Sequence, residues 1–267
     1  MTGPEQMIEL DGVSYRYPDG GWAVENVSFG LQRGERVVLL GGNGCGKSTL
    51  LKLLDALMLP TRGEFRYRGQ AVSAKRVRER EWSRRFRGEV AMVFQDPDAM
   101  LFNASVAEEI AYGPVRLGMP EPLRHAQTWA RRFGLERYLE TPPYRLSGGE
   151  KQRLCLACVL ACGPRVLLLD EPTANLDPRA TGWLIDFLHD QPGLTTLVST
   201  QNLSLAAELG QRALILGENG ALLFDGPLDT ALADTELLWR ANLAHSHRHL
   251  HADGTEHRHV HVHGDWG

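Results

Sequence analysis

The chain has 267 residues, 43% of them hydrophobic, and a formal net charge of −4 at pH 7. These values fit a globular protein of one large or two small domains, and the charge argues against a general nucleic-acid-binding surface. No apolar run approaches the roughly 18 residues of a membrane-spanning helix, and the N-terminus lacks the pattern of a signal peptide. We therefore expect a cytoplasmic protein that acts at a membrane only through partner subunits.

The first predicted element is an antiparallel hairpin. Residues 7–17 and 23–31 have the pattern of strands, and the Pro-Asp-Gly-Gly run at 18–21 is a strong turn signal between them. Tyr17 ends the first strand, where its ring could stack on a nucleotide base or pack on a neighbour in the hairpin. The motifs that follow favour stacking.

A phosphate-binding motif occupies residues 41–48, after an apolar strand-like run at 37–40 and before a predicted helix. Its glycines permit positive φ, so that backbone N–H groups can surround phosphate oxygens at the helix N-terminus. Lys47 would reach the β- and γ-phosphates and Ser48 would ligate Mg²⁺, whereas the alternative is a plain Gly-rich turn. The expected nucleotide contacts come from Gly41, Asn43, Gly44, Cys45, Gly46, Lys47, Ser48 and Thr49.

Residues 64–74 read as a second hairpin and the basic stretch 75–87 as a charged surface helix. The strand predicted at 90–95 ends in Gln95, whose carboxamide could contact Mg²⁺ and the attacking water, because ligands bind at the carboxyl ends of parallel strands. Residues 97–143 change to helical patterning. They are expected to form a helical insertion between core strands.

A second anion site is predicted at the Leu-Ser-Gly-Gly-Glu run of residues 146–150, because its backbone N–H groups open a helix. In that helix Cys155, Cys158 and Cys162 share one face by their spacing. We expect them to be small core residues, with a redox or metal role as the alternative. Four cysteines in the chain are too few for a disulfide framework.

An acidic pair, Asp170 and Glu171, ends the buried strand predicted at 165–169. Asp170 can hold Mg²⁺ through water, and Glu171 points the other way and can polarise the attacking water. Asp177 lies in the loop that caps the next helix.

These motifs occur in the order seen in ABC transporter ATPases, and residues 7 to about 228 resemble that family. The resemblance implies an α/β fold: a P-loop NTPase (RecA-like) core with an N-terminal antiparallel β subdomain and an inserted α-helical signature subdomain at about 97–163. The expected layout is an ABC ATPase domain over 1–228, a C-terminal helix over 229–244 and a tail over 245–267.

The resemblance also implies an ATPase that works as a head-to-tail dimer, in which each ATP lies between one subunit's phosphate loop and the other's signature helix. Ser147 and Gly149 would then contact the γ-phosphate held by an identical partner chain, and Gly148 and Asp177 would belong to the same nucleotide site. Glu171, Gln95 and Gln201 would be the catalytic side chains. The departure is Gln201, because the family usually has a histidine there, and an amide can neither carry positive charge nor shuttle a proton.

Residues 93–102 and 111–114 resemble ATPases of energy-coupling-factor importers, particularly their cobalt and nickel branch. This implies an ATPase at the cytoplasmic face of the cell membrane that powers metal import, with nickel ahead of cobalt. Its partners would be an integral membrane coupling subunit, docked on residues 97–114, and a substrate-binding membrane subunit, with no nucleic acid. The alternatives are another cargo, such as a vitamin, a soluble ABC ATPase in cofactor assembly, and a metal store.

The tail from residue 245 is rich in histidine and poor in apolar residues, which predicts disorder in the absence of metal. Alternating His-x-His in an extended chain puts imidazoles on one side, which suits Ni²⁺, Co²⁺, Cu²⁺ or Zn²⁺. The alternatives are an expression tag and a merely solvating tail. The candidate ligands are His245, His247, His249, His251, His257, His259, His261 and His263.

Overall fold

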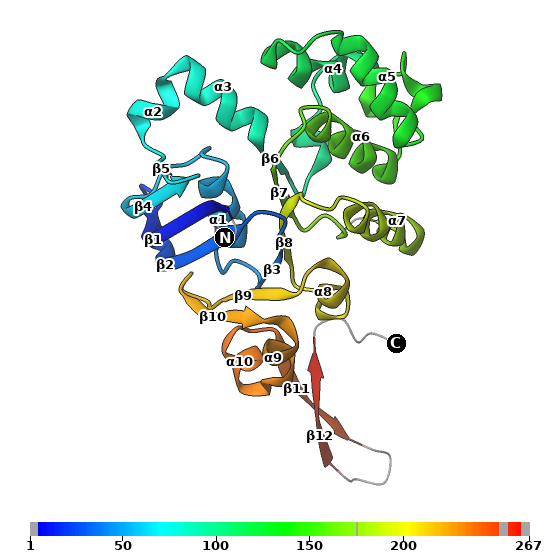
Figure 1. Cartoon of the computed structure of the whole chain (residues 1–267). Coiled ribbons are helices and arrows are strands. Elements are labelled where there is room, and N and C mark those ends of the chain that lie inside the picture. The colour runs from blue at the N-terminus through cyan, green and yellow to red at the C-terminus, as the bar shows by residue number, and fades with distance from the viewer. Residues whose placement is uncertain (1–4, 175, 251–255, 263–267) are drawn as a thin grey trace.

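The structure is a computed structural model that describes residues 5–174, 176–250 and 256–262 (Figure 1). Its strands are β1 (Gln6–Arg16), β2 (Trp22–Gln32), β3 (Arg36–Leu40), β4 (Arg62–Tyr67), β5 (Gln70–Ala71), β6 (Val90–Val93), β7 (Val166–Asp170), β8 (Thr195–Thr200), β9 (Arg212–Leu216), β10 (Leu222–Pro227), β11 (Ala244–Leu250) and β12 (Glu256–Val262). Its α-helices are α1 (Lys47–Leu54), α2 (Ala74–Arg78), α3 (Arg80–Glu89), α4 (Val106–Leu117), α5 (Pro122–Arg132), α6 (Gly148–Leu160), α7 (Pro178–His189), α8 (Leu203–Leu209), α9 (Leu228–Ala233) and α10 (Thr235–Arg240).

A mixed sheet in the order β10-β9-β3-β8-β7-β6 forms the centre of the molecule. Its strands run parallel except β10, which pairs antiparallel with β9. The short apolar runs of the sequence become these strands because both faces of the sheet are covered. The carboxyl ends of β3, β8, β7 and β6 therefore meet at one edge.

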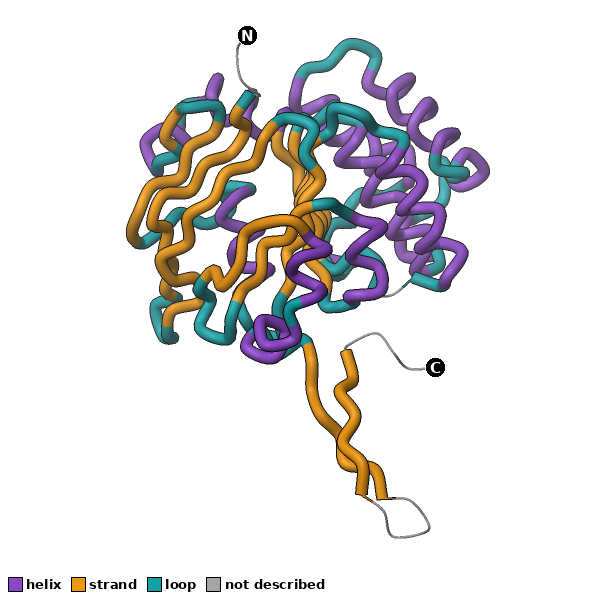
Figure 2. Tube along the Cα trace, turned by 60° about the horizontal axis from the view of Figure 1, so that its bottom comes forward, coloured by secondary structure: helices purple, strands orange, loops and turns teal. Residues whose placement is uncertain are grey.

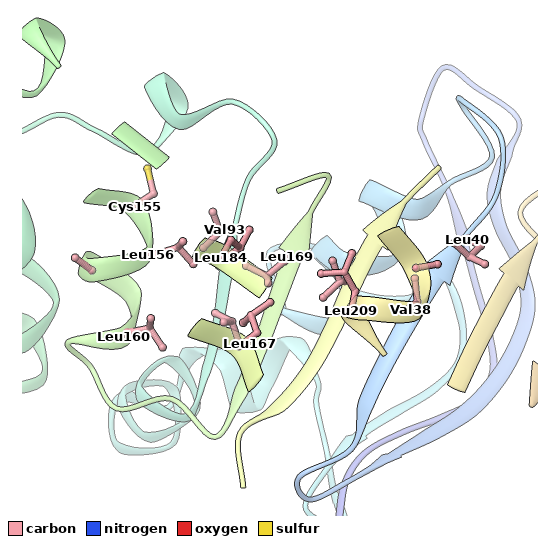
Figure 3. Close-up of a cluster of buried hydrophobic side chains, with 14 of the residues drawn as sticks. Val38, Leu40, Val93, Cys155, Leu156, Leu160, Leu167, Leu169, Leu184 and Leu209 are labelled. Atoms are coloured by element: carbon pink, nitrogen blue, oxygen red, sulfur yellow. The ribbon is translucent and has the colours of Figure 1, made fainter. Parts of the chain in front are cut away.

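Alternate side chains of the central strands enter two separate cores. On one face Val38, Leu40, Leu167 and Leu169 belong to one core. In it Leu167 and Leu169 lie near residues of α6 and α7, whereas Val38 lies near Leu209 of α8 (Figure 3). On the other face Val37, Leu39 and Leu168 pack with α1 and with the second sheet. The central sheet is thus the middle of three layers.

The second sheet is antiparallel, in the order β2-β1-β4-β5, and contains the predicted N-terminal hairpin. Leu10 lies opposite Phe29 of β2 and opposite Phe65 of β4, so the two predicted hairpins join into one sheet through the pairing of β1 with β4. The N-terminal antiparallel β subdomain is confirmed.

The predicted helical insertion contains α4, α5 and α6, which lie together on the far side of the central sheet from the antiparallel sheet (Figure 2). Pro114 lies inside α4, and Pro122 occupies the first turn of α5.

The basic stretch 75–87 was predicted to be one charged surface helix, but it forms parts of two helices, α2 and α3. It also buries Phe86, on which the Trp82 ring stacks with the centroids 4.9 Å apart. Within the described residues, every helix is too short or too polar to cross a membrane.

The C-terminal region differs from the sequence prediction in two ways. The expected helix over 229–244 is two helices, because Asp234 has an extended backbone and its side chain accepts the N–H of Leu237 to start α10. The tail predicted to be disordered forms an antiparallel hairpin of β11 and β12 that projects from the body (Figure 2). His-x-His alternation has the period of a strand as well as that of a metal-binding motif. His251 and His263 lie outside the described residues.

We expect Glu109→Ala to lower the free energy of unfolding by about 1–3 kcal/mol, because buried Glu109 accepts three hydrogen bonds. Its carboxylate binds the N–H groups of Phe102 and Asn103 at 2.9 and 2.7 Å and the Asn103 amide at 3.0 Å. Urea denaturation measures the effect. The control is Glu108→Ala on the exposed side of α4, expected to change stability by less than about 0.5 kcal/mol. Equal losses in the two variants would contradict the role given to Glu109.

Candidate nucleotide site

A pocket of about 300 Å³ lies at the carboxyl ends of β3, β6, β7 and β8, where ligands bind in open α/β sheets. A larger pocket, of about 740 Å³, lies at the opposite edge around Gly34 and Pro192, away from every predicted motif. The smaller pocket is lined by Tyr17, Ala23, Asn43, Gly44, Gly46, Lys47, Ser48, Thr49, Gln95, Glu171 and Gln201.

The loop between β3 and α1 can close around an anion because of its glycines. Gly46 has φ of 101°, and a Cβ there would lie 2.1 Å from the carbonyl oxygen of Ala23. The loop therefore packs directly against β2, which is why Ala23 reaches the pocket although no motif marks it. Its backbone turns into α1 at Lys47.

Lys47 is buried and its ammonium group lies among oxygen atoms. Nζ donates to the carbonyls of Gly41 at 2.8 Å and Gly42 at 3.1 Å, and lies 3.7 Å from Glu171 Oε1. Phosphate oxygens could take the place of these acceptors, since a lysine ammonium is a compact charge with three donors. The geometry fits the expected contact with phosphate.

Tyr17 stands at the mouth of the pocket, with 40% of its surface exposed. Its hydroxyl lies 3.2 Å from Thr49 Oγ1, and its ring meets the Tyr15 ring edge-on at 5.1 Å. The exposed ring is free to stack on a base, and packing in the hairpin holds it in place. Both expectations for Tyr17 are thus compatible with this position.

Cys45 does not line the pocket but is buried beneath the loop. Burial raises the pKa of its thiol, more than the nearby charge of Lys47 lowers it. The thiol is therefore neutral at physiological pH, and Cys45 is not among the pocket-lining residues although it was expected to contact the nucleotide.

The acidic pair is held by strand β8. Ser199 is the register partner of Asp170, and its hydroxyl donates to Asp170 Oδ1 at 2.7 Å. The same hydroxyl oxygen accepts the N–H of Glu171 at 3.0 Å. Ser199 was not predicted, because it is one of four hydroxyl residues in β8 and nothing in the sequence distinguishes it from the others.

Glu171 faces the pocket at the end of β7, with an unusual backbone φ of 43°. Burial raises the pKa of its carboxyl, while Lys47 and hydrogen bonds from the Gln201 backbone and the Thr200 hydroxyl lower it. Its buried Oε1 has no hydrogen-bond partner among the described residues. A buried acceptor without a partner suits a group that binds a water molecule of the reaction.

Gln95 and Gln201 enter the same pocket after β6 and β8. Asp170 is buried and is not one of the residues that line the pocket. The hydroxyl, amide and carboxylate oxygens of Ser48, Gln95 and Asp170 are the hard ligands that Mg²⁺ prefers, so this donor set fits the predicted ion.

The second predicted anion site is not part of this pocket. Ser147 and Gly148 are exposed at the start of α6, where Glu150 accepts the Ser147 N–H at 2.9 Å and its hydroxyl at 2.8 Å. Hydrogen bonds from Tyr138 and Ser147 lower the pKa of Glu150. Asp177 instead caps α7 by accepting the N–H of Ala180. The pocket-lining residues thus exclude Ser147, Gly148, Gly149 and Asp177.

Of the three cysteines predicted to be core residues, Cys155 and Cys158 lie in α6 and Cys162 follows it, and Cys158 and Cys162 are only half-buried. Cys155 is buried, with its sulfur 3.7 Å from the carbonyl oxygen of Pro97, and burial raises the pKa of its thiol to about 12. Among residues 5–174 and 176–244, no three His, Cys, Asp or Glu side chains are grouped to hold a metal ion.

Comparison with known proteins places these motifs in context. Residues 24–174 match the family described as ABC transporter. The energy-coupling factor transporter ATP-binding protein EcfA of Methanothermobacter thermautotrophicus is 36% identical over 89% of this chain and 76% of its own length.

Two solved structures have the same fold. The chain is similar to cbiO1 of Clostridium perfringens, part of the ABC transporter complex cbiONQ, with a TM-score of 0.73, 29% identity and coverage of 90% of this chain and 95% of that one. It is also similar to the ATP-binding cassette MJ0796 in a dimeric post-hydrolysis state with ADP and Pi, with a TM-score of 0.72, 27% identity and coverage of 83% and 99%.

We expect the rate of nucleotide hydrolysis to fall on acidification with a midpoint above the ordinary glutamate value of 4.5, because the ionised form of Glu171 is the one that can accept a proton. A pH profile of kcat measures this midpoint. Glu171→Gln should lose roughly 10²-fold or more of the rate and, in its residual activity, the acid limb.

The control for this substitution is Asp190→Asn, an exposed carboxyl at the end of α7, which should keep the wild-type profile. An acid limb that survives in Glu171→Gln would show that another group titrates.

Proposed function

The chain belongs to the ABC transporter ATPase family and hydrolyses ATP, and from this premise we propose that it powers import of a transition-metal ion through an energy-coupling-factor type transporter. The support is its similarity to EcfA and to cbiO1. The observation that carries the proposal is an open groove. It is lined in part by the segments 93–102 and 111–114, which resemble the energy-coupling-factor ATPases. Nickel stands ahead of cobalt as cargo, on the strength of the histidine tail.

The docking groove lies between the central sheet and α4 and α6, and has a volume of about 260 Å³. Phe102 and Tyr112 are 66% and 39% exposed at its rim, with ring centroids 4.9 Å apart in an edge-to-face pair. Met92, Met100 and Cys158 contribute soft apolar surface. An amphipathic helix fits such a groove, and we assign it to the membrane coupling subunit, at the cytoplasmic face of the membrane.

Two separate anion sites on one chain favour a dimer. The phosphate loop lines the pocket, whereas the exposed start of α6 does not, so Ser147, Gly148 and Gly149 are open to nucleotide held by a second copy. Asp177, at the start of α7, belongs to the same surface. In this proposal ATP is bound by residues 41–49 of one subunit and α6 of its partner, as in the family's head-to-tail arrangement.

In catalysis, Glu171 orients and deprotonates the attacking water, and Gln95 also contacts that water. Ser48 and Gln95, with Asp170 through water, would hold Mg²⁺, which would neutralise charge on the phosphates when bound. Gln201 donates an amide hydrogen bond to the γ-phosphate.

The histidine hairpin is proposed as a transition-metal site. The strand register puts His245 opposite His261, His247 opposite His259 and His249 opposite His257. Opposed residues of an antiparallel pair share one face, and imidazole is a preferred ligand for Ni²⁺, Co²⁺, Cu²⁺ and Zn²⁺.

The competing functions are transport of another cargo, such as a vitamin, and soluble cofactor assembly. Copurification with an integral membrane subunit separates the importer from the soluble ATPase, and the identity of that subunit indicates the cargo.

We expect Gln201→His to raise the steady-state ATPase rate about tenfold, because a histidine can carry positive charge and transfer a proton. The Gln201 backbone contact with Glu171 does not depend on the side chain, so the substitution leaves the carboxylate in place. The control is Gln201→Ala, which removes the amide and should be slower than wild type. A histidine variant no faster than wild type would show that this position does not limit turnover.

We expect Phe102→Asp to abolish copurification with the membrane coupling subunit, because the docked helix would desolvate a carboxylate at the rim, where the wild type offers an apolar ring. The readout is a gentle detergent pull-down from the native host. Leu123→Asp is the matched control, since Leu123 is 62% exposed on α5 and outside the groove. Retained binding by Phe102→Asp, or equal loss in both variants, would refute docking at this groove.

A further inference from the structure

The C-terminal segment after α10 touches the phosphate loop directly. The N–H of Gly42 donates to the carbonyl oxygen of Ala241 at 3.0 Å. The two segments are close-packed as well, because a Cβ added at Gly42 would lie 3.1 Å from the Asn242 Cβ. Residues far apart in the sequence thus pack directly against the phosphate loop.

This hydrogen bond fixes a peptide group that Lys47 also holds. In the peptide between Gly41 and Gly42, the carbonyl oxygen accepts from Lys47 Nζ at 2.8 Å, and the N–H donates to Ala241. If Lys47 turned to a phosphate, it would leave this carbonyl. The contact with Ala241 is then the hydrogen bond that keeps the peptide oriented.

Ala241 is joined to the histidine hairpin by a short, packed connection. The chain turns at Asn242, with φ of 55°, through hydrogen bonds from Asn242 to Trp239 and from Leu243 to Leu238. Leu243 is fully buried and Ala244, the first residue of β11, is 6% exposed. His245 follows immediately, so no flexible linker separates the hairpin from the segment on the loop.

We propose that a divalent transition metal bound to the histidine hairpin tightens ATP binding, through residues 241–244 and their contact with Gly42. This inference rests on the proposed metal site of the tail. Metal bridging β11 and β12 reduces the motion of the first residues of β11. The Ala241 carbonyl is then held in place for the Gly42 N–H, and a loop ordered in advance loses less entropy when it closes on phosphate.

Coupling of this kind is reciprocal, so ATP must tighten metal binding by the same factor. The free chain would then bind metal weakly and the nucleotide-loaded chain more tightly. The hairpin would act as a sensor that lets metal supply adjust occupancy of the nucleotide site.

The test measures ATP affinity of the full chain by calorimetry in excess Mg²⁺, with and without one equivalent of Ni²⁺, and Ni²⁺ affinity with and without ATP. Two variants accompany the wild type. In the first, the six paired histidines are replaced by asparagine, at positions 245, 247, 249, 257, 259 and 261. In the second, Gly-Ser-Gly-Ser is inserted after Ala244, which keeps the paired histidines and the Ala241 contact but separates them.

In the wild type we expect Ni²⁺ to lower the Kd for ATP about fivefold or more, and ATP to lower the Kd for Ni²⁺ by the same factor. The insertion variant should bind Ni²⁺ like wild type in the absence of ATP and show no change in ATP affinity. The asparagine variant should bind Ni²⁺ weakly. Any change in its ATP affinity on addition of Ni²⁺ therefore measures the effect of Ni²⁺ bound to the nucleotide itself.

Each contrary outcome has its own meaning. Wild-type chain that binds Ni²⁺ with unchanged ATP affinity would overturn the coupling and leave the metal site standing. Absence of Ni²⁺ binding at micromolar concentration would overturn the metal site and the coupling with it. A Ni²⁺ effect that persists in the insertion variant would overturn the route through residues 241–244.

Discussion

The position of one ammonium group governs the site. Lys47 lies buried between the carbonyls of its own loop and the carboxylate of Glu171, so it joins the ends of β3 and β7 although β8 lies between these strands. Without this cation, inward-facing carbonyls and a buried carboxylate would face each other without compensation. The arrangement is poised for an anion, because phosphate oxygens can replace the carbonyls as partners of the same group.

Strand β8 is the second organising element. Its end contacts both acids, since the Ser199 hydroxyl binds Asp170 and the backbone of Gln201, directly after the strand, is hydrogen-bonded to Glu171. Asp170 and Glu171 thus have different environments despite adjacent positions, because Asp170 accepts a hydroxyl hydrogen bond whereas Oε1 of Glu171 accepts none from the described residues. This difference arises where the chain leaves the sheet, because Asp170 is the last residue of β7 and Glu171 follows it with φ of 43°, and it underlies the separate roles given to the two acids.

Much of the fold and site could be predicted because the signals are local. The glycine pattern before Lys47 and the apolar runs that end at Gln95 and Glu171 each specify an element together with its functional residue. Ser199, Ala23 and Ala241 were missed because their roles depend on pairing between distant segments, which the sequence does not encode as a motif. The break at Asp234 was missed because a helix cap inside a helical pattern resembles a surface acid.

The strand order has a consequence for the synthesis of the chain. β3 carries the phosphate loop, yet its sheet neighbours are β8 and β9, whose residues follow it by more than 150 positions in the sequence. Contacts of such separation form late, since a long loop must be closed first. A nascent chain therefore cannot complete its nucleotide site until β8 and β9 have left the ribosome. Until then the apolar surface of β3 remains uncovered, and a ribosome that stalls before β8 leaves a product prone to aggregation.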